Sequence, residues 1–325
     1  MKTIIIRTLG GKEIGYGHFY RCLSLAKALI LSEKKIEIIF LINDELVDLI
    51  KNTSFNFLMS NNLSEDINVI FQIDVNLFIF DSYLGNNQYL RKIKKRTKLM
   101  LIDDNNDIYD TTIPDIIYNG NVFAEDLGYP YVEGQIQLIG SKFLIMREEY
   151  WDNSNDEDID NQIILVTTGG TDEYGIAVKI INEIKTVDVN IGIIIGPGYK
   201  EDYIKIIEKI KTENMRLIYK PNSLKKYINY SKVVITAGGS TVYEVLSQNK
   251  VPILYSIADN QDLICKTLNN MGIDYLGKYP YIDYSHLAKL VKRTCDTVRC
   301  KNYIANVITG KGVFLVVESV LDMLN

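Results

Sequence analysis

The chain has 325 residues, of which 36 are lysine or arginine and 41 are aspartate or glutamate, so its formal net charge at pH 7 is −5. This length suits two domains of ordinary size. The charge balance lacks the basic excess that a nucleic-acid-binding surface needs, so we expect no nucleic-acid partner.

The four cysteines are scattered, and with only two histidines they match no common zinc-binding pattern. We interpret them as reduced thiols of a cytoplasmic protein. The first apolar run, Ile4–Ile6, is too short for a signal peptide, and no segment approaches the roughly 20 apolar residues that span a bilayer. We expect a cytoplasmic monomer without stable membrane insertion, bound metal or other cofactor.

Short apolar runs alternate with amphipathic stretches along the first half of the chain. Four runs are apolar throughout, as parallel strands covered on both faces are: Ile4–Ile6, Ile36–Leu41, Leu77–Phe80 and Leu99–Ile102. The stretch Arg21–Leu31 has apolar residues at helical spacing. This βαβ alternation predicts an open parallel sheet with right-handed crossovers.

An acidic, polar segment begins at Asp152 and continues through Asp158, and such a composition predicts an exposed linker. The alternation then restarts with four further predicted strands: Ile163–Val166, Ile191–Ile195, Val233–Thr236 and Ile253–Tyr255. We predict two similar doubly wound, Rossmann-like α/β lobes, residues 1–155 and 160–325. Because ligands collect at the carboxyl ends of parallel strands, the site is expected in a cleft between the lobes.

The loop between the first strand and the first helix contains Gly15, Gly17 and His18. The glycines allow close approach of a ligand, and the following helix N-terminus offers free N–H groups to an anion. The dinucleotide-binding fingerprint fails because Tyr20 stands at its third glycine. The helix dipole disfavours protonation of His18, and a neutral imidazole is what a general base requires. A purely structural His18 fits the spacing equally well.

Two glycine-rich turns follow predicted strands of the second lobe. Gly169-Gly170-Thr171-Asp172 suits a strand-to-helix turn, in which Asp172 could be only the helix cap. Gly238-Gly239-Ser240-Thr241 presents N–H groups and hydroxyls to a diphosphate, and Glu244 could bind both hydroxyls of a ribose. A capping arrangement is the alternative for this turn also, although a ligand is favoured.

Other polar side chains follow other strands. Asn260 and Gln261 carry donors and acceptors that suit sugar hydroxyls or acetamido groups. Asp103 and Asp104 could form a carboxylate pair for acid–base catalysis, but capping is the commoner use of such residues. Asn119 lies in another polar turn at a strand end.

Together these loops resemble the UDP-2,4-diacetamido-2,4,6-trideoxy-β-L-altropyranose hydrolases of pseudaminic acid biosynthesis, the PseG- or SpsG-like proteins. The likeness opens with Gly15-x-Gly17-His18-x-x-Arg21-Cys22 and closes with Ile308-Thr309-Gly310-Lys311-Gly312-Val313. The opening is its specific part, because the Gly-Gly-Ser-Thr and Asn-Gln elements are shared with N-acetylglucosaminyltransferases. Two positions depart from the family pattern: Asn249-Lys250 replaces Leu-Gly, and Thr309 replaces an aspartate.

The resemblance implies the glycosyltransferase-B (GT-B) fold and a hydrolysis that releases UDP from a UDP-linked 2,4-diacetamido-2,4,6-trideoxyhexose. It places the catalytic residues at His18, which would deprotonate a water, and Tyr83. The expected nucleotide contacts are Gly17, Gly238, Gly239, Ser240, Thr241 and Glu244, and the expected sugar contacts are Asn119, Gly170, Thr171, Asp172, Asn260 and Gln261. A GT-B glycosyltransferase that moves the sugar to an acceptor other than water is the alternative.

Overall fold

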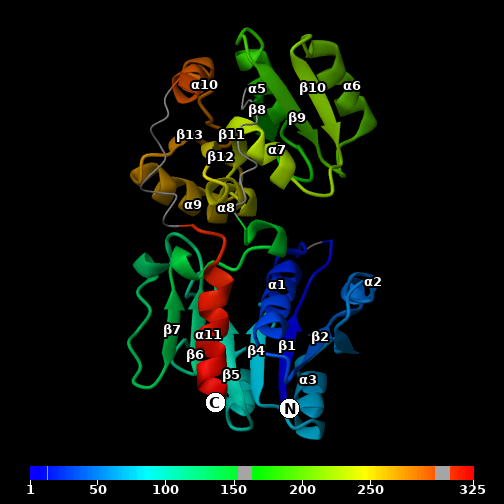
Figure 1. The fold of residues 1–325 in the computed structure, drawn as a ribbon, viewed down its shortest axis with the longest axis vertical. Coiled ribbons are helices and arrows are strands. Elements are labelled where there is room, and N and C mark those ends of the chain that lie inside the picture. The colour runs from blue at the N-terminus through cyan, green and yellow to red at the C-terminus, as the bar shows by residue number, and fades with distance from the viewer. Residues whose placement is uncertain (13, 153–162, 297–307) are drawn as a thin grey trace. The chain divides into compact units, whose positions relative to one another are not determined.

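The computed structural model describes residues 1–12, 14–152, 163–296 and 308–325. The chain divides into two compact units (Figure 1), a first lobe of residues 1–151 with 311–325 and a second lobe of residues 152–310. Each lobe contains a parallel sheet with helices packed against it, as predicted. The acidic linker lies, from residue 153 onward, outside the described residues, and the cleft between the lobes stays a prediction.

The described part of the first lobe contains a seven-stranded parallel sheet of order β3-β2-β1-β4-β5-β6-β7. Its strands are β1 (Lys2–Thr8), β2 (Ile36–Ile42), β3 (Asn56–Met59), β4 (Leu77–Asp81), β5 (Lys98–Ile102), β6 (Ile116–Asn119) and β7 (Ile136–Ile139). The four predicted strands are confirmed as β1, β2, β4 and β5. The strand order changes direction between β1 and β4, and such a switch point opens a crevice at the carboxyl ends of the strands.

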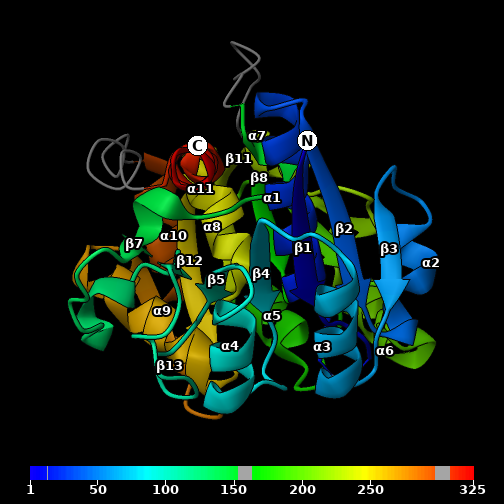
Figure 2. The same cartoon turned by 90° about the horizontal axis from the view of Figure 1, so that it is seen from below.

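Neighbouring side chains of β1 pack on opposite faces of this sheet. Ile4 and Ile6 join the core formed with α1 (Gly17–Ser32), α2 (Val47–Ile50) and α11 (Gly312–Leu324). Ile5 joins the opposite core, formed with α3 (Leu63–Gln72) and α4 (Asn87–Lys94). Figure 2 shows α1 with α11 on one side of the strands and α3 with α4 on the other. Because both faces are covered, the strand sequence is apolar throughout rather than alternating.

The last helix, α11, packs on the first lobe, whereas the sequence analysis assigned it to the second lobe as part of residues 160–325. Its buried Val313 and Val316 complete the core that α1 also contacts. Gly312 packs against the backbone of Lys142 and Leu144, and an added Cβ at this position would lie 2.6 Å from the Leu144 backbone nitrogen. A glycine is therefore needed here because no side chain fits. Gly312 belongs to the closing motif by which the chain resembles the family.

The described part of the second lobe contains a six-stranded parallel sheet of order β10-β9-β8-β11-β12-β13. Its strands are β8 (Ile163–Thr167), β9 (Asn190–Ile195), β10 (Met215–Tyr219), β11 (Ser231–Ala237), β12 (Val251–Ser256) and β13 (Asp274–Lys278). The four predicted strands are confirmed as β8, β9, β11 and β12. The order changes direction between β8 and β11, so the turns after these two strands, which are the two glycine-rich turns, lie at a second switch point.

Six helices accompany the described strands of this sheet: α5 (Ile176–Ile184), α6 (Glu201–Ile210), α7 (Lys225–Asn229), α8 (Ser240–Ser247), α9 (Asp259–Asn270) and α10 (Leu287–Asp296). Apolar residues of α5, α6 and α10 form one core with the sheet. Helices α8 and α9 pack on β12, α8 also on β11 and α9 also on β13. None of the described helices in either lobe is long and apolar enough to cross a membrane.

A buried ion pair anchors the carboxyl end of β1 in the first lobe. The side chains of Arg7 and Asp66 are 1% and 0% exposed, and Nε of Arg7 lies 3.1 Å from Oδ2 of Asp66. Arg7 also donates to the carbonyl oxygens of Leu41 and Ser60, and the Tyr89 hydroxyl donates to Asp66 Oδ2 at 2.9 Å. The network thereby ties β1 to β2, α3 and α4 beside the switch point.

Replacing Asp66 by alanine should therefore strongly destabilise the first lobe, because the Arg7 charge would remain buried without its partner. We expect a loss of about 3–5 kcal/mol in the free energy of unfolding, measured by urea denaturation. Asp48→Ala removes an exposed carboxylate from the same lobe and should cost less than about 1 kcal/mol. Equal losses in the two variants would show that the ion pair does not stabilise the fold.

Candidate active site

The first switch point brings His18 and Asp81 together. His18 is the second residue of α1, Asp81 is the last residue of β4, and the pairing of β4 with β1 places Asp81 opposite Thr8. Nδ1 of His18 lies 2.6 Å from Oδ1 of Asp81. A ring nitrogen so close to a carboxylate carries the hydrogen, so the neutral ring is the Nδ1–H tautomer and Nε2 keeps its lone pair.

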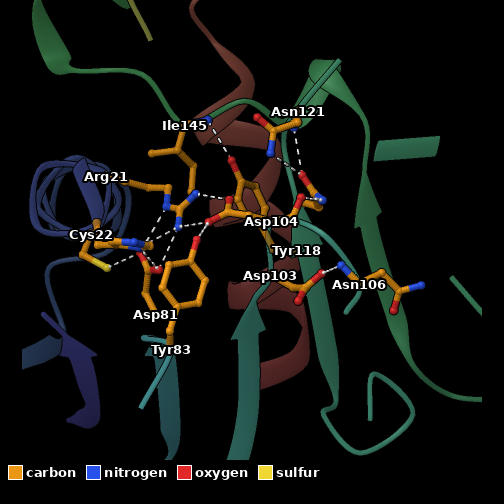
Figure 3. Close-up of polar contacts among 12 residues, drawn as sticks. Arg21, Cys22, Asp81, Tyr83, Asp103, Asp104, Asn106, Tyr118, Asn121 and Ile145 are labelled. Carbon is orange, nitrogen blue, oxygen red and sulfur yellow. Dashed lines mark hydrogen bonds and ion pairs between the residues drawn. The ribbon is translucent and has the colours of Figure 1, made fainter. Parts of the chain in front are cut away.

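Arg21, one turn after His18 on α1, holds two carboxylates at once (Figure 3). Its Nε and Nη2 donate to Asp81 at 3.0 and 2.7 Å, and its Nη1 and Nη2 donate to Asp104 at 2.7 and 3.2 Å. Asp81 ends β4 and Asp104 follows β5, the neighbouring strand. Two-point contacts between a guanidinium and carboxylates fix the orientation of both groups, so Asp81 is held facing His18.

Tyr83, the second position that the resemblance marks as catalytic, lies beside His18. The two rings meet edge to face with centroids 4.9 Å apart. The Tyr83 hydroxyl donates its hydrogen to Asp104 Oδ2 at 2.7 Å, so its oxygen is left as an acceptor. Burial and the Asp104 carboxylate raise the pKa of Tyr83 far above its usual range, which makes the phenol a poor proton donor. Its edge contact suits orienting the imidazole, and the catalytic role of Tyr83 stays a prediction.

The charges around His18 decide its protonation. Burial lowers the pKa of His18, but the hydrogen bond and charge of Asp81, with a further contribution from Asp104, outweigh burial and the opposing charge of Arg21. The pKa of His18 therefore lies above the ordinary value of 6.5. The expected shift toward a neutral His18 at the helix start is therefore wrong, because two carboxylates that the sequence did not place beside the ring favour its protonated form.

Asp103 and Asn119 hold the turns beneath this cluster. Asp103 accepts from the Asn106 backbone N–H at 2.6 Å and from the Tyr129 hydroxyl, so it orders the turn after β5, where no helix begins among the described residues. Asp104 forms an ion pair with Arg21 instead. Asn119 is 0% exposed, and its amide donates to the Asp104 carbonyl oxygen at 3.0 Å and to Tyr129 at 2.9 Å. Its Oδ1 accepts from the Asn121 N–H. The polar atoms of Asn119 are therefore buried and already hydrogen-bonded, and its contact with a sugar stays a prediction.

The turn after β8 is a helix start in the second lobe. Asp172 accepts from the backbone N–H groups of Ile176 and Ala177 at 2.9 and 2.7 Å and also from the Tyr203 hydroxyl. Asp172 therefore caps α5, which is the alternative that the sequence left open. Gly170 and Thr171 are exposed in the same turn, and their contact with a sugar stays a prediction.

The turn after β11 combines a tight contact with an open backbone. A Cβ at Gly238 would lie 2.4 Å from the Cys265 sulfur, so this glycine allows α9 to pack against the turn. Gly239 has open space around it and immediately precedes α8, whose first residues Ser240 and Thr241 are partly or fully exposed. Such a helix start can bind an anion. Glu244 is only 6% exposed, and its contact with a ribose stays a prediction.

Asn260 and Gln261 lie at the start of α9. The Gln261 side-chain oxygen accepts from the Ile257 N–H at 3.1 Å, and Asn260 Oδ1 accepts from the Gln261 N–H at 2.9 Å. Their oxygens therefore order this turn locally, while Asn260 is exposed. The described residues hold no group of three or more potential metal ligands among His, Cys, Asp and Glu.

Arg21 and Asp81 are functional candidates to which the sequence alone assigned no role, and Asp104 was indicated only as half of a possible carboxylate pair with Asp103. Both aspartates directly follow predicted strands, and Arg21 is part of the opening motif, so each carried a signal. Their convergence on His18 depends on β1, β4 and β5 being adjacent in the sheet.

No protein-family model matches the chain. It is 25% identical to an uncharacterised protein of Methanocaldococcus jannaschii, with all of this chain and 67% of that protein covered. It is 25% identical to the UDP-2,4-diacetamido-2,4,6-trideoxy-beta-L-altropyranose hydrolase of Campylobacter jejuni, covering 85% of this chain and 99% of that one. It is 24% identical to the spore coat polysaccharide biosynthesis protein SpsG of Bacillus subtilis, with 81% and 80% covered. The resemblance seen in the sequence is confirmed.

Solved structures with the same fold include MurG of Acinetobacter baumannii, with a TM-score of 0.67 and 11% identity over 100% of this chain and 99% of that one. They also include the glycosyltransferase VinC in complex with DTDP, with a TM-score of 0.70 and 9% identity over 99% of each chain. At this identity the likeness concerns the fold alone. The chain has the GT-B type of fold, as the resemblance implied.

The raised pKa of His18 predicts a pH-dependent contribution to stability. A group whose pKa is higher in the folded than in the unfolded chain stabilises the fold fully below the unfolded value and loses that effect as pH rises through the folded value. His18→Asn should therefore lower the free energy of unfolding more at pH 5.5 than at pH 9, measured by denaturant titration at both pH values. A larger loss at pH 9 would contradict the charged His18–Asp81 pair.

Proposed function

We propose that this chain, a relative of the Campylobacter hydrolase and of SpsG, hydrolyses a UDP-linked 2,4-diacetamido-2,4,6-trideoxyhexose and releases UDP. The reaction would serve pseudaminic acid or related surface-sugar biosynthesis. The observation that carries the proposal is the His18–Asp81 pair at the first switch point, because it fixes the tautomer in which Nε2 can accept a proton. Similarity to a named hydrolase over 85% of the chain supports the substrate class.

In the proposed reaction, Nε2 of His18 takes a proton from water while the water oxygen attacks the anomeric carbon of the sugar. The bond between that carbon and the diphosphate oxygen breaks, and its electron pair leaves with UDP. The imidazolium that forms is stabilised by Asp81, which already accepts from Nδ1. Backbone N–H groups at the start of α8 would hold the charge of the departing diphosphate.

A glycosyltransferase would use the same base on an acceptor hydroxyl, and the solved structures of this fold include a named glycosyltransferase. The two functions differ in the need for an acceptor. UDP release from UDP-sugars in buffer alone supports the hydrolase, whereas release that occurs only after an acceptor is added supports the transferase.

The proposed mechanism makes turnover depend on His18 as the base. His18→Asn removes the base while keeping a polar side chain, so UDP release should fall by roughly 10²–10⁴-fold. The affinity for UDP, measured by calorimetry, should change little because the diphosphate is expected at α8. Turnover close to that of the wild type in a folded His18→Asn protein would leave the mechanism without its base.

Glu244 is the residue expected to bind the ribose of the nucleotide. If the Glu244 carboxylate binds the ribose, Glu244→Ala leaves the ribose hydroxyls unpaired and should weaken UDP binding by about 1–3 kcal/mol. Glu183→Ala, which removes an exposed carboxylate from α5 in the same lobe, should bind UDP normally. Thermal unfolding of both variants checks the fold, because Glu244 is buried. Unchanged affinity in a folded Glu244→Ala protein would refute the ribose assignment.

A further inference from the structure

We propose that Arg21 and Asp104 are positioning residues that set the proton affinity of His18, with Arg21 orienting Asp81 and Asp104 offsetting part of the effect of the positive charge that Arg21 brings. The inference deepens the proposed function by naming the residues that make His18 a base strong enough to deprotonate water. Its catalytic part rests on that function, whereas its structural part can be measured without any substrate.

Arg21 has two opposite effects on His18. Its contacts with both oxygens of Asp81 lock the carboxylate that accepts from Nδ1. Its Nη2 also lies 3.1 Å from Nδ1 of His18. Because Nδ1 already carries the hydrogen that Asp81 accepts, both nitrogens are donors and this close approach is repulsive. Arg21 alone would therefore orient the base and weaken it.

Asp104 offsets this weakening. It takes two hydrogen bonds from Arg21 and one from Tyr83, and its side chain is 20% exposed, as is that of Arg21. Burial opposes ionisation of Asp81 and Asp104, but the Arg21 charge holds the pKa of each carboxyl below its usual range. Both aspartates are thus charged at neutral pH, and the surplus negative charge faces the imidazole.

The charges therefore favour the uptake of one proton by this cluster, which consists of His18, Arg21, Asp81, Tyr83 and Asp104. With neutral His18 it carries two negative charges and one positive charge, and with protonated His18 its charges balance. A cluster of low exposure is more stable when its charges are matched. Protonation of His18 at Nε2 balances the charges of the cluster. In the proposed reaction this proton comes from the attacking water.

The chain offers a matched control for Asp104 in the next residue along the sequence. Asp103 carries the same charge, but its side chain turns away from Arg21 toward Asn106 (Figure 3). Asp104→Asn and Asp103→Asn thus remove one carboxylate each from adjacent positions, and both keep a side-chain oxygen that can accept a hydrogen bond. Only the first substitution removes a charge that balances Arg21.

The experiment is a pH titration of ¹⁵N-histidine-labelled protein by NMR. The chain contains two histidines, so His18 and the exposed His286 are readily told apart by the His18→Asn variant. In the wild type, His18 should titrate above 6.5, and its neutral form should show an unprotonated Nε2. Asp104→Asn should move the His18 midpoint down by about one pH unit, and Asp103→Asn should leave it in place.

Three results would overturn the inference: an Nε2–H tautomer in the wild type, no movement of the midpoint in Asp104→Asn, or equal movement in both variants. The tautomer is measured on the wild-type protein, so it remains a test even if a variant fails to fold. Asp104→Ser removes the same charge and replaces Asp104→Asn in that case.

The kinetic readout separates the inference from the proposed function. The acidic limb of the pH profile of kcat/KM for UDP release should move with the His18 midpoint in Asp104→Asn, and the plateau should fall by a factor below about ten because the base is weaker. If the midpoint moves as expected but no UDP-sugar is hydrolysed, the proposed function fails and the positioning roles stand. If hydrolysis occurs and neither the midpoint nor the limb moves, the positioning roles fail.

Discussion

The adjacency of β1 and β4 in the first sheet is the constraint on which the candidate site depends. It sets the end of β4 beside the loop that leads into α1, so Asp81 meets His18 and Arg21 although about 60 residues separate them along the chain. His18 and Arg21 are about one helical turn apart on α1, so both side chains lie on the face of the helix that meets Asp81. A strand order without this switch point would leave the opening motif without its carboxylate.

The surrounding structure holds that adjacency in place. The Arg7–Asp66 pair fixes the same end of β1 from the opposite face of the sheet, and α11 closes the core beneath α1. Because the hydrogen bonds of the His18 cluster need side chains placed to within fractions of an ångström, these distant contacts support the geometry of the site. Asn119 serves the same end by holding the backbone of Asp104.

The second lobe uses its strand ends differently. At the turn after β8, Asp172 accepts hydrogen bonds from the first backbone N–H groups of α5. At the turn after β11, by contrast, Gly239 has open space around it. The same residue types that suggest ligand binding are those that satisfy the free N–H groups of a helix start. Both turns have the same sequence pattern, in which a strand is followed by two glycines and a hydroxyl or acidic residue. This pattern predicts the turn but does not decide whether the turn caps a helix or binds a ligand.

The sequence by itself determined the two α/β lobes, eight of their strands and the loops at their carboxyl ends, because buried parallel strands are recognisable as short apolar runs. It also pointed to His18 and to the residues that follow β4 and β5. It did not determine the strands β3, β6 and β7, whose four residues carry too little pattern, or β10 and β13, which mix polar with apolar residues. It also did not determine the lobe on which α11 packs. Only the tertiary structure decided the protonation of His18, because that depends on which carboxylates lie near the ring. Electrostatic interactions act through space, and distance along the chain does not reveal distance in the fold.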